Sequence, residues 1–176
     1  MFRCKDLVEK LDYEVVQGLL DREVTDVVYD SRKVSEGCLY ICIEGAVFFF
    51  FSKAYEATEK GAAVLVVQKD VEVPKDSDVT IIKVENTRYA MAFISAAYFG
   101  NPGDKLKVIG ITGTKGKTTT TYLVKSILEH AGHKVGLVGT IEALIGDKKI
   151  PASNTTPESY VLQQSFREMV DAGCDV

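Results

Sequence analysis

The stretch V-I-G-I-T-G-T-K-G-K-T-T-T-T, from Val108 to Thr121, carries the strongest structural signal in the second half of this chain. It begins with apolar, β-prone residues, continues into a glycine-rich turn and reaches a Lys-Thr pair. Glycines leave backbone N–H groups free to converge on phosphate oxygens, a lysine supplies a mobile cation, and a threonine hydroxyl suits Mg²⁺. The stretch therefore predicts a phosphate-binding loop for a nucleoside triphosphate, with Lys117 on the phosphates and Thr118 on the metal.

The residues on either side of the turn support a phosphate loop. A strand is predicted over 107–112, and the helix after the turn has an apolar face made of Leu123, Val124, Ile127, Leu128 and Ala131. Gly132 ends that helix, and a second strand is predicted over 134–140. This order predicts a βαβ unit with the loop at the carboxyl end of its first strand. The strict spacing G-x-x-x-x-G-K-[ST] requires glycine at position 111, so the loop is a variant.

Composition narrows the class of protein. The chain has 176 residues, of which 46% are hydrophobic, and a formal net charge of -4, which argues against a nucleic-acid partner. Its four cysteines form no C-x-x-C pair, which indicates reduced thiols in a cytosolic setting. The apolar run over 46–51 is too short to cross a bilayer. We expect a cytoplasmic monomer with neither a nucleic-acid nor a membrane partner.

The first half of the chain predicts a small domain of its own. Strands are predicted over 38–43, 62–67 and 79–84, and helices over 52–60 and 88–99. The turn Gly-Asn-Pro-Gly at 100–103 predicts a domain boundary. The expected fold class is therefore α/β, with a small N-terminal α/β domain over 1–103 and the incomplete start of a phosphate-loop α/β domain over 104–176. The last residues read as the beginning of a new strand, so we expect a fragment of a longer protein.

Two polar segments allow a structural and a functional interpretation. Asn-Thr-Thr-Pro-Glu at 154–158 predicts a helix start, with Thr155 and Glu158 as a capping box and Pro157 in the first turn. The same helix start could hold an anionic or sugar group of a substrate, and both interpretations can hold together. Asp-Ser-Arg-Lys at 30–33 is either a solvated turn or a contact for a diphosphate.

Three motifs taken together resemble the Mur ligase family. They are D-S-R-K-V at 30–34, I-T-G-T-K-G-K-T-T-T at 111–120 and N-T-T-P-E at 154–158. The resemblance covers essentially the whole chain in the family's order, and it is nearest to the members that add the third residue of the peptidoglycan stem. It implies a first domain that binds the uridine diphosphate part of the substrate, a central domain that binds ATP and a C-terminal domain that helps close the site.

The resemblance also assigns roles to individual residues. It implies that Ser31 and Tyr29 contact the uridine diphosphate, that Lys117 is catalytic and that Thr118 binds Mg²⁺. The ATP-binding set is Gly113, Thr114, Lys115, Gly116, Lys117, Thr118 and Thr119, and the set on the muramoyl-peptide substrate is Asn154, Thr155 and Thr156. Two positions depart from the family's pattern. Lys115 stands where the family usually has Asn, and Phe49-Phe50-Phe51 stands where members typically have Asp-Gly-His.

The chemistry implied by the resemblance is ATP-dependent amide formation. The γ-phosphoryl group of ATP passes to a carboxylate of UDP-N-acetylmuramoyl-L-alanyl-D-glutamate, and the amine of a diamino acid attacks the acyl phosphate. The sequence leaves open whether that diamino acid is diaminopimelate or lysine, and we expect the fragment to bind without ligating. The alternatives are a D-alanyl-D-alanine-adding ligase, a folylpolyglutamate synthetase, a non-catalytic nucleotide-sugar-binding module, and a phosphate-loop kinase or GTPase, which the glycine spacing disfavours.

Overall fold

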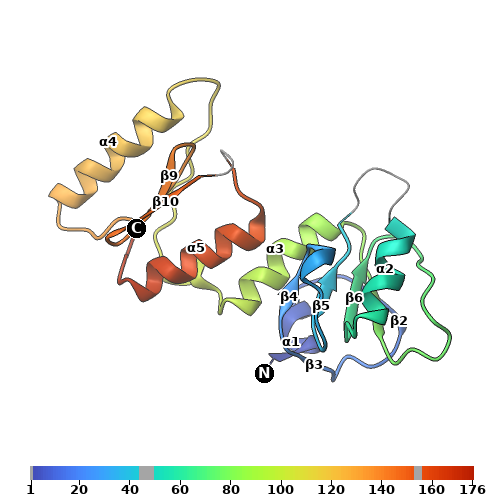
Figure 1. Cartoon of the computed structure of the whole chain (residues 1–176). Helices are drawn as coiled ribbons and strands as arrows, with labels where there is room; N and C mark the ends of the chain where they lie inside the picture. Colours follow the sequence, from blue (N-terminus) through green and yellow to red (C-terminus); the bar gives the residue numbers. More distant parts are fainter. Residues whose placement is uncertain (1, 44–49, 153–155) are drawn as a thin grey trace. The chain divides into compact units, whose positions relative to one another are not determined.

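The computed structural model describes residues 2–43, 50–152 and 156–176. The chain is of mixed α/β class and forms two compact units, Met1–Tyr98 and Phe99–Val176 (Figure 1). The predicted domain boundary after Gly103 stays a prediction.

The first unit is built on a five-stranded sheet with the strand order β2-β7-β6-β5-β4. Its strands are β2 (Glu14–Gln17), β4 (Val27–Val28), β5 (Leu39–Ile41), β6 (Val64–Val67) and β7 (Thr80–Lys83). Strands β4 to β7 are parallel, and β2 pairs antiparallel with β7. A short antiparallel pair, β1 (Phe2–Arg3) with β3 (Glu23–Val24), accompanies this sheet. The three predicted strands are therefore confirmed, each a few residues shorter than predicted.

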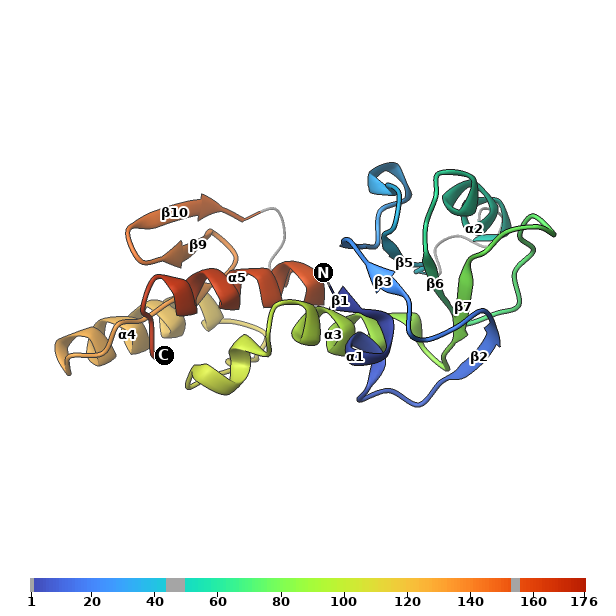
Figure 2. The ribbon, with the colours of Figure 1, turned by 90° about the horizontal axis from the view of Figure 1, so that it is seen from below.

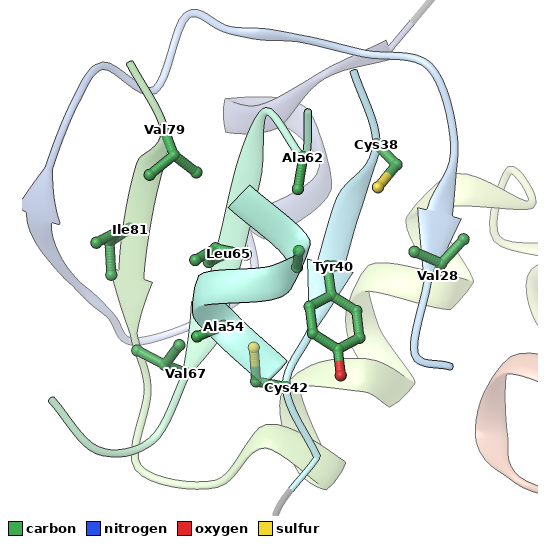
Figure 3. Packing of buried hydrophobic residues seen from close by; sticks show 11 residues of the cluster. Val28, Cys38, Tyr40, Cys42, Ala54, Ala62, Leu65, Val67, Val79 and Ile81 are labelled. Atoms are coloured by element: carbon green, nitrogen blue, oxygen red, sulfur yellow. The ribbon is translucent and has the colours of Figure 1, made fainter. Parts of the chain in front are cut away.

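Helices cover the sheet because its strands are apolar on both faces. Helix α2 (Phe50–Glu59) packs against alternate residues of the strands, in a cluster that includes Val28, Cys38, Tyr40, Cys42, Leu65, Val67, Val79 and Ile81 (Figure 3). The residues between them point to the other face, as the period of two requires. Helices α1 (Cys4–Val8) and α3 (Thr87–Tyr98) lie side by side (Figure 2). A 3₁₀ turn, η1 (Ser31–Lys33), follows β4.

The predicted helix over 52–60 begins two residues earlier, at Phe50, and stops before Gly61, as predicted. Gly61 has φ +86°, a backbone conformation that favours glycine. Phe49, and the side chains of Phe50 and Phe51, lie outside the described residues, so the predicted effect of the phenylalanine run stays a prediction.

The second unit contains an antiparallel three-stranded sheet with the order β10-β9-β8. The strands are β8 (Leu137–Val138), β9 (Glu142–Ile145) and β10 (Lys148–Pro151), and the helices are α4 (Lys117–His130), α5 (Ser159–Asp171) and the 3₁₀ turn η2 (Pro102–Lys105). Helix α5 lies against β9, as Figure 2 shows, and Met169, Ile145 and Cys174 form the buried centre of this contact. Gly132, with φ +91°, follows the end of α4 as predicted.

The predicted βαβ unit is wrong for the described residues. Residues 107–112 form no strand, and Val108 and Ile109 are 56% and 55% exposed. The one backbone hydrogen bond described for this segment runs from the Lys107 N–H to the Asp175 carbonyl, 2.9 Å. A strand needs a neighbour to pair its backbone groups, and β8 pairs with β9 instead. The segment before the loop is therefore not a strand of any sheet in the described part of the chain.

The end of the chain runs between two segments of the second unit. The Asp175 N–H donates to the Lys134 carbonyl and the Gly136 N–H donates to the Val176 carbonyl, both at 2.9 Å, while Asp175 also accepts from Lys107. The predicted new strand at the chain end stays a prediction, but its backbone groups already bond on both sides.

The cysteines behave as apolar core residues. Cys4, Cys38, Cys42 and Cys174 are all buried and form no disulfide, as expected of core residues, and the prediction of reduced thiols stays a prediction. Within the described ranges, no helix has the length and apolar character needed to cross a membrane.

Candidate functional site

The phosphate loop is shaped by the glycine that precedes α4. Gly116 is the N-cap of the helix and has φ +80°, in the left-handed region that favours glycine. No atom lies within 4 Å of the position that a Cβ on Gly116 would take, so the requirement for glycine is conformational and not steric. The turn therefore directs the chain into α4 with the backbone N–H groups of the first helical turn unpaired.

Lys117 and Thr118 lie at the start of α4, as the sequence predicts. The Lys117 Nζ folds back and donates a hydrogen bond to the Gly113 carbonyl at 2.7 Å. Thr118 is half-buried, and its Oγ1 donates to the Oγ1 of Thr140 at 3.5 Å. The loop thus gathers a cation, hydroxyl groups and helix-terminal amides at one place, where an anion is favoured by the helix dipole.

This set of donors fits a magnesium-bound nucleotide. Hydroxyl oxygens are hard ligands that suit Mg²⁺, and the exposed Lys117 ammonium group lies at the loop, bonded to the Gly113 carbonyl. The first turn of α4 reads Lys-Thr-Thr-Thr, so no carboxylate there opposes a phosphate.

The apolar cavity of the second unit is separate from the residues predicted to bind ATP. It has a volume of about 350 Å³ and is lined by residues 106–111, one side of α4, the residues around β8 and part of α5. None of residues 113–119 lines it. Val124 and Leu128 face this cavity, whereas Leu123 and Ile127, predicted on the same apolar face, are 59% and 67% exposed. The predicted face of α4 is therefore only half covered.

In the first unit, the segment after β4 holds the residues that the resemblance places at a uridine diphosphate. Tyr29, Asp30 and Ser31 follow the carboxyl end of a parallel strand, where ligands bind in open α/β sheets. Ser31 and Tyr29 are half-buried. Lys60 donates from its Nζ to the Ser31 carbonyl at 3.1 Å and so ties this segment to the end of α2.

Asp30 caps the turn and also forms an ion pair with Arg32. One Asp30 oxygen caps η1 by accepting from the Arg32 N–H at 3.0 Å. The Arg32 guanidinium grips both carboxylate oxygens, with its Nε 2.9 Å from Oδ1 and its Nη2 2.6 Å from Oδ2. These hydrogen bonds from Arg32 hold the pKa of the Asp30 carboxyl well below its usual range. Arg32 therefore serves the turn, which weakens the expectation that it meets a diphosphate.

Tyr40 lies beneath Ser31 and was not predicted as part of the site. Burial among apolar side chains raises the pKa of the Tyr40 phenol, while a hydrogen bond with the Ser31 side chain acts in the opposite direction. The phenol is only 3% exposed, and Figure 3 shows its oxygen at the edge of the cluster, beside Cys42. In the sequence, Tyr40 reads as an ordinary strand residue, so no pattern indicated this contact.

The third predicted segment is only partly described. Asn154 and Thr155 lie outside the described residues, and Thr156 is exposed. The predicted helix start is wrong: α5 begins at Ser159, and its N-cap is Glu158, with ψ 151°. Pro157 therefore precedes the helix, because Glu158 is still outside the helical region and the chain turns helical only at Ser159.

Thr140 is the other residue that the sequence analysis missed. It is exposed and follows β8, within reach of Thr118. A polar residue at the carboxyl end of a predicted strand, in a unit where the phosphate loop also follows a predicted strand, was a usable signal.

Comparison with known proteins identifies a family model and several relatives that match the chain. Residues 111–176 match the family model described as the Mur ligase middle domain. The chain is 51% identical over 171 residues to the UDP-N-acetylmuramoyl-L-alanyl-D-glutamate--2,6-diaminopimelate ligase of Clostridium perfringens, an alignment that covers 97% of this chain and 35% of that protein. The chain thus spans about a third of the length of the curated relatives it matches.

Solved structures of ligases share this fold. A structure of a UDP-N-acetylmuramoyl-L-alanyl-D-glutamate--2,6-diaminopimelate ligase has a TM-score of 0.78 at 19% identity and covers 98% of this chain and 34% of that one. The MurF ligase of Thermotoga maritima, solved in complex with ADP, has a TM-score of 0.50 at 25% identity and covers 83% of this chain and 29% of its own. The sequence motifs, the family model that matches residues 111–176 and the 51% identity to a diaminopimelate ligase all point to one family. The chain belongs to the Mur ligase family.

Proposed function

We propose that this chain is part of an ATP-dependent amide ligase of peptidoglycan synthesis, which adds 2,6-diaminopimelate to UDP-N-acetylmuramoyl-L-alanyl-D-glutamate. The observation that carries the proposal is the 51% identity to a ligase of that name over 97% of the chain. The geometry of the phosphate loop supports it, because Lys117 and Thr118 start α4 directly after the left-handed Gly116.

In this proposal, residues 113–119 bind the phosphates of ATP. Lys117 leaves the Gly113 carbonyl and donates to the phosphates, where it stabilises the charge that spreads over the transferred group. Thr118 would hold Mg²⁺, which would supply positive charge to the phosphates when bound. The substrate carboxylate takes the γ-phosphoryl group, and the amine of the amino acid then displaces phosphate. The ADP in the structure of the MurF ligase of Thermotoga maritima supports a nucleotide in this fold.

The first unit binds the uridine diphosphate of the substrate in this proposal, through Ser31 and Tyr29, and Asn154, Thr155 and Thr156 meet the muramoyl peptide. Diaminopimelate is preferred to lysine because the relatives of 42–51% identity are named for it. The protein acts as a cytoplasmic monomer, in line with its acidic net charge of -4, and this chain binds its ligands without ligating them.

Calorimetry with the 176-residue chain tests the proposal. One titration uses UDP-N-acetylmuramoyl-L-alanyl-D-glutamate, and a second uses Mg-ATP. We expect both to bind, and Ser31→Ala to weaken the sugar nucleotide about tenfold, because a hydrogen bond to a charged group contributes ~1.5 kcal/mol or more. Ser35→Ala removes a hydroxyl from the same loop at an exposed position and serves as the matched control, with less than about a twofold effect.

The alternatives predict different outcomes of the same titrations. A non-catalytic nucleotide-sugar module binds the sugar nucleotide and not Mg-ATP. A phosphate-loop kinase or GTPase binds a nucleoside triphosphate and does not bind the sugar nucleotide. If Ser31→Ala and Ser35→Ala behave alike, the assignment of Ser31 is wrong even when the substrate binds.

A further inference from the structure

Two side-chain hydrogen bonds join the first turns of α4 to the segment after β8. Thr118 donates to Thr140, with 3.5 Å between the two Oγ1 atoms, and the Tyr122 hydroxyl donates to Oε1 of Glu142 at 2.9 Å. Thr118 and Tyr122 are four residues apart and so lie on one face of the helix. Thr140 lies in the turn between the antiparallel strands β8 and β9, and Glu142 is the first residue of β9. The two contacts therefore join one face of the helix to one end of this hairpin.

The Thr118 hydroxyl makes a different hydrogen bond from its neighbour on the helix. Thr121 donates to the Thr118 carbonyl at 2.7 Å, the local bond that threonines commonly make in helices. Thr118 instead donates away from its own helix, to Thr140. A hydroxyl has one proton and two lone pairs, so the direction of the proton fixes where the lone pairs point.

This direction matters if Thr118 binds Mg²⁺. A hydroxyl that gives a lone pair to a cation must send its proton elsewhere, and the bound cation makes that proton a stronger donor. An acceptor on the side away from the metal therefore favours the ligating orientation. Thr140 supplies that acceptor. The Tyr122–Glu142 contact holds the segment that carries Thr140 against the helix. The hydrogen bond to Glu142 raises the pKa of the Tyr122 phenol, so Tyr122 stays a neutral donor.

We propose that Thr140 is a positioning residue for the metal: it accepts the proton of Thr118, so that Thr118 presents a lone pair to the Mg²⁺ of the bound nucleotide. The inference rests on the proposed function, because it requires a magnesium nucleotide at the phosphate loop. It adds a residue from outside the loop motif, more than 20 positions along the chain.

The test separates the contribution of the metal from that of the nucleotide. ATP is titrated into the chain with excess Mg²⁺ and again with EDTA. The dissociation constant in EDTA divided by that in Mg²⁺ measures how much the metal strengthens binding. Thr140→Val keeps the shape of the side chain and removes the acceptor. We expect this ratio to fall about three- to tenfold, the effect of one hydrogen bond, while the dissociation constant in EDTA changes less than about twofold.

Other variants make the result specific. Thr140→Ser retains the hydroxyl and should restore the ratio, and Thr118→Val should lower it at least as far as Thr140→Val. Thr120→Val, the same change at an exposed position of α4, is the matched control and should leave the ratio unchanged. Circular dichroism shows whether each variant folds; if valine disturbs folding, Thr140→Ala against Thr140→Ser gives the same comparison.

Two outcomes overturn the inference and one overturns its basis. A Thr140→Val chain with the full effect of Mg²⁺ shows that Thr118 needs no partner. A variant that loses affinity equally in Mg²⁺ and in EDTA shows that Thr140 contacts the nucleotide itself or supports the loop. If the unchanged chain binds no nucleotide under either condition, the proposed function fails and the inference fails with it.

Discussion

Replacement of Lys117 by methionine tests the phosphate loop most directly. In the structure, the Lys117 Nζ already donates to the Gly113 carbonyl at 2.7 Å, so binding of a phosphate exchanges one partner for another. A charge-assisted hydrogen bond to phosphate contributes up to about 3 kcal/mol, and the bond to the exposed carbonyl offsets about 1 kcal/mol of this. The difference of about 2 kcal/mol corresponds to a dissociation constant about 30-fold higher for Lys117→Met.

Calorimetric titration with Mg-ATP measures this change. Lys148→Met removes the same charge from β10, where the lysine side chain is 73% exposed, and should change the dissociation constant less than about twofold. Both variants should unfold at nearly the same urea concentration as the unchanged chain, because the bond to Gly113 is exposed. Equal affinities for Lys117→Met and Lys148→Met would refute the reasoning, since Lys117 would then contribute only net charge.

Three further predictions concern the first unit. Gly18→Ala should lower the free energy of unfolding by at least about 2 kcal/mol in urea titrations, because Gly18 has φ +81° and a Cβ there would lie 2.8 Å from the Thr80 Cα; an unchanged midpoint would contradict the backbone described here. Leu65→Ala should lower it by about 2–5 kcal/mol, because Leu65 is fully buried in the middle of the sheet, and a loss below about 1 kcal/mol would show that the cluster repacks. Asp30→Asn should destabilise the unit at pH 7. The pKa of Asp30 is lowered in the folded state, so its contribution is present above the unfolded value near ~3.9 and is lost as the pH falls through the folded value; the gap between variant and unchanged chain should therefore shrink from pH 4 towards pH 2, and a gap that does not depend on pH would exclude this ion pair as its cause.

The first unit was predictable because its strands and helices are locally consistent. Residues 64–67 are all apolar and β-prone, and the structure buries all of them in a strand with parallel neighbours on both sides. Helix α3 also follows its prediction within a residue at each end, because its apolar face spans the whole helix. The two short strands of this unit that pair with each other, β1 and β3, have two residues each and were too short to show a pattern in the sequence.

The second unit shows what local pattern cannot fix. Residues 107–112 have the composition of a strand, but a strand exists only when other segments pair with it, and the described partners offer a single backbone hydrogen bond. For the same reason Leu123 and Ile127 on α4 stay exposed although their spacing is right for burial. Helix α5 starts later than the capping pattern predicts, at Ser159. Pro157 disfavours a helical Thr156 and so argues against Thr155 as the cap, but no local pattern marked Glu158 as the N-cap.

The predicted phosphate loop, the places of Lys117 and Thr118 at a helix start, and the family to which the motifs point can be read from the chain, because they depend on the order and conformational limits of neighbouring residues. Which side chains from distant positions meet them depends on how the elements pack. The contacts of Thr140 with Thr118 and of Lys60 with Ser31 join residues 22 and 29 positions apart. Such contacts follow from the packing of whole elements against each other, which no periodicity in the chain encodes.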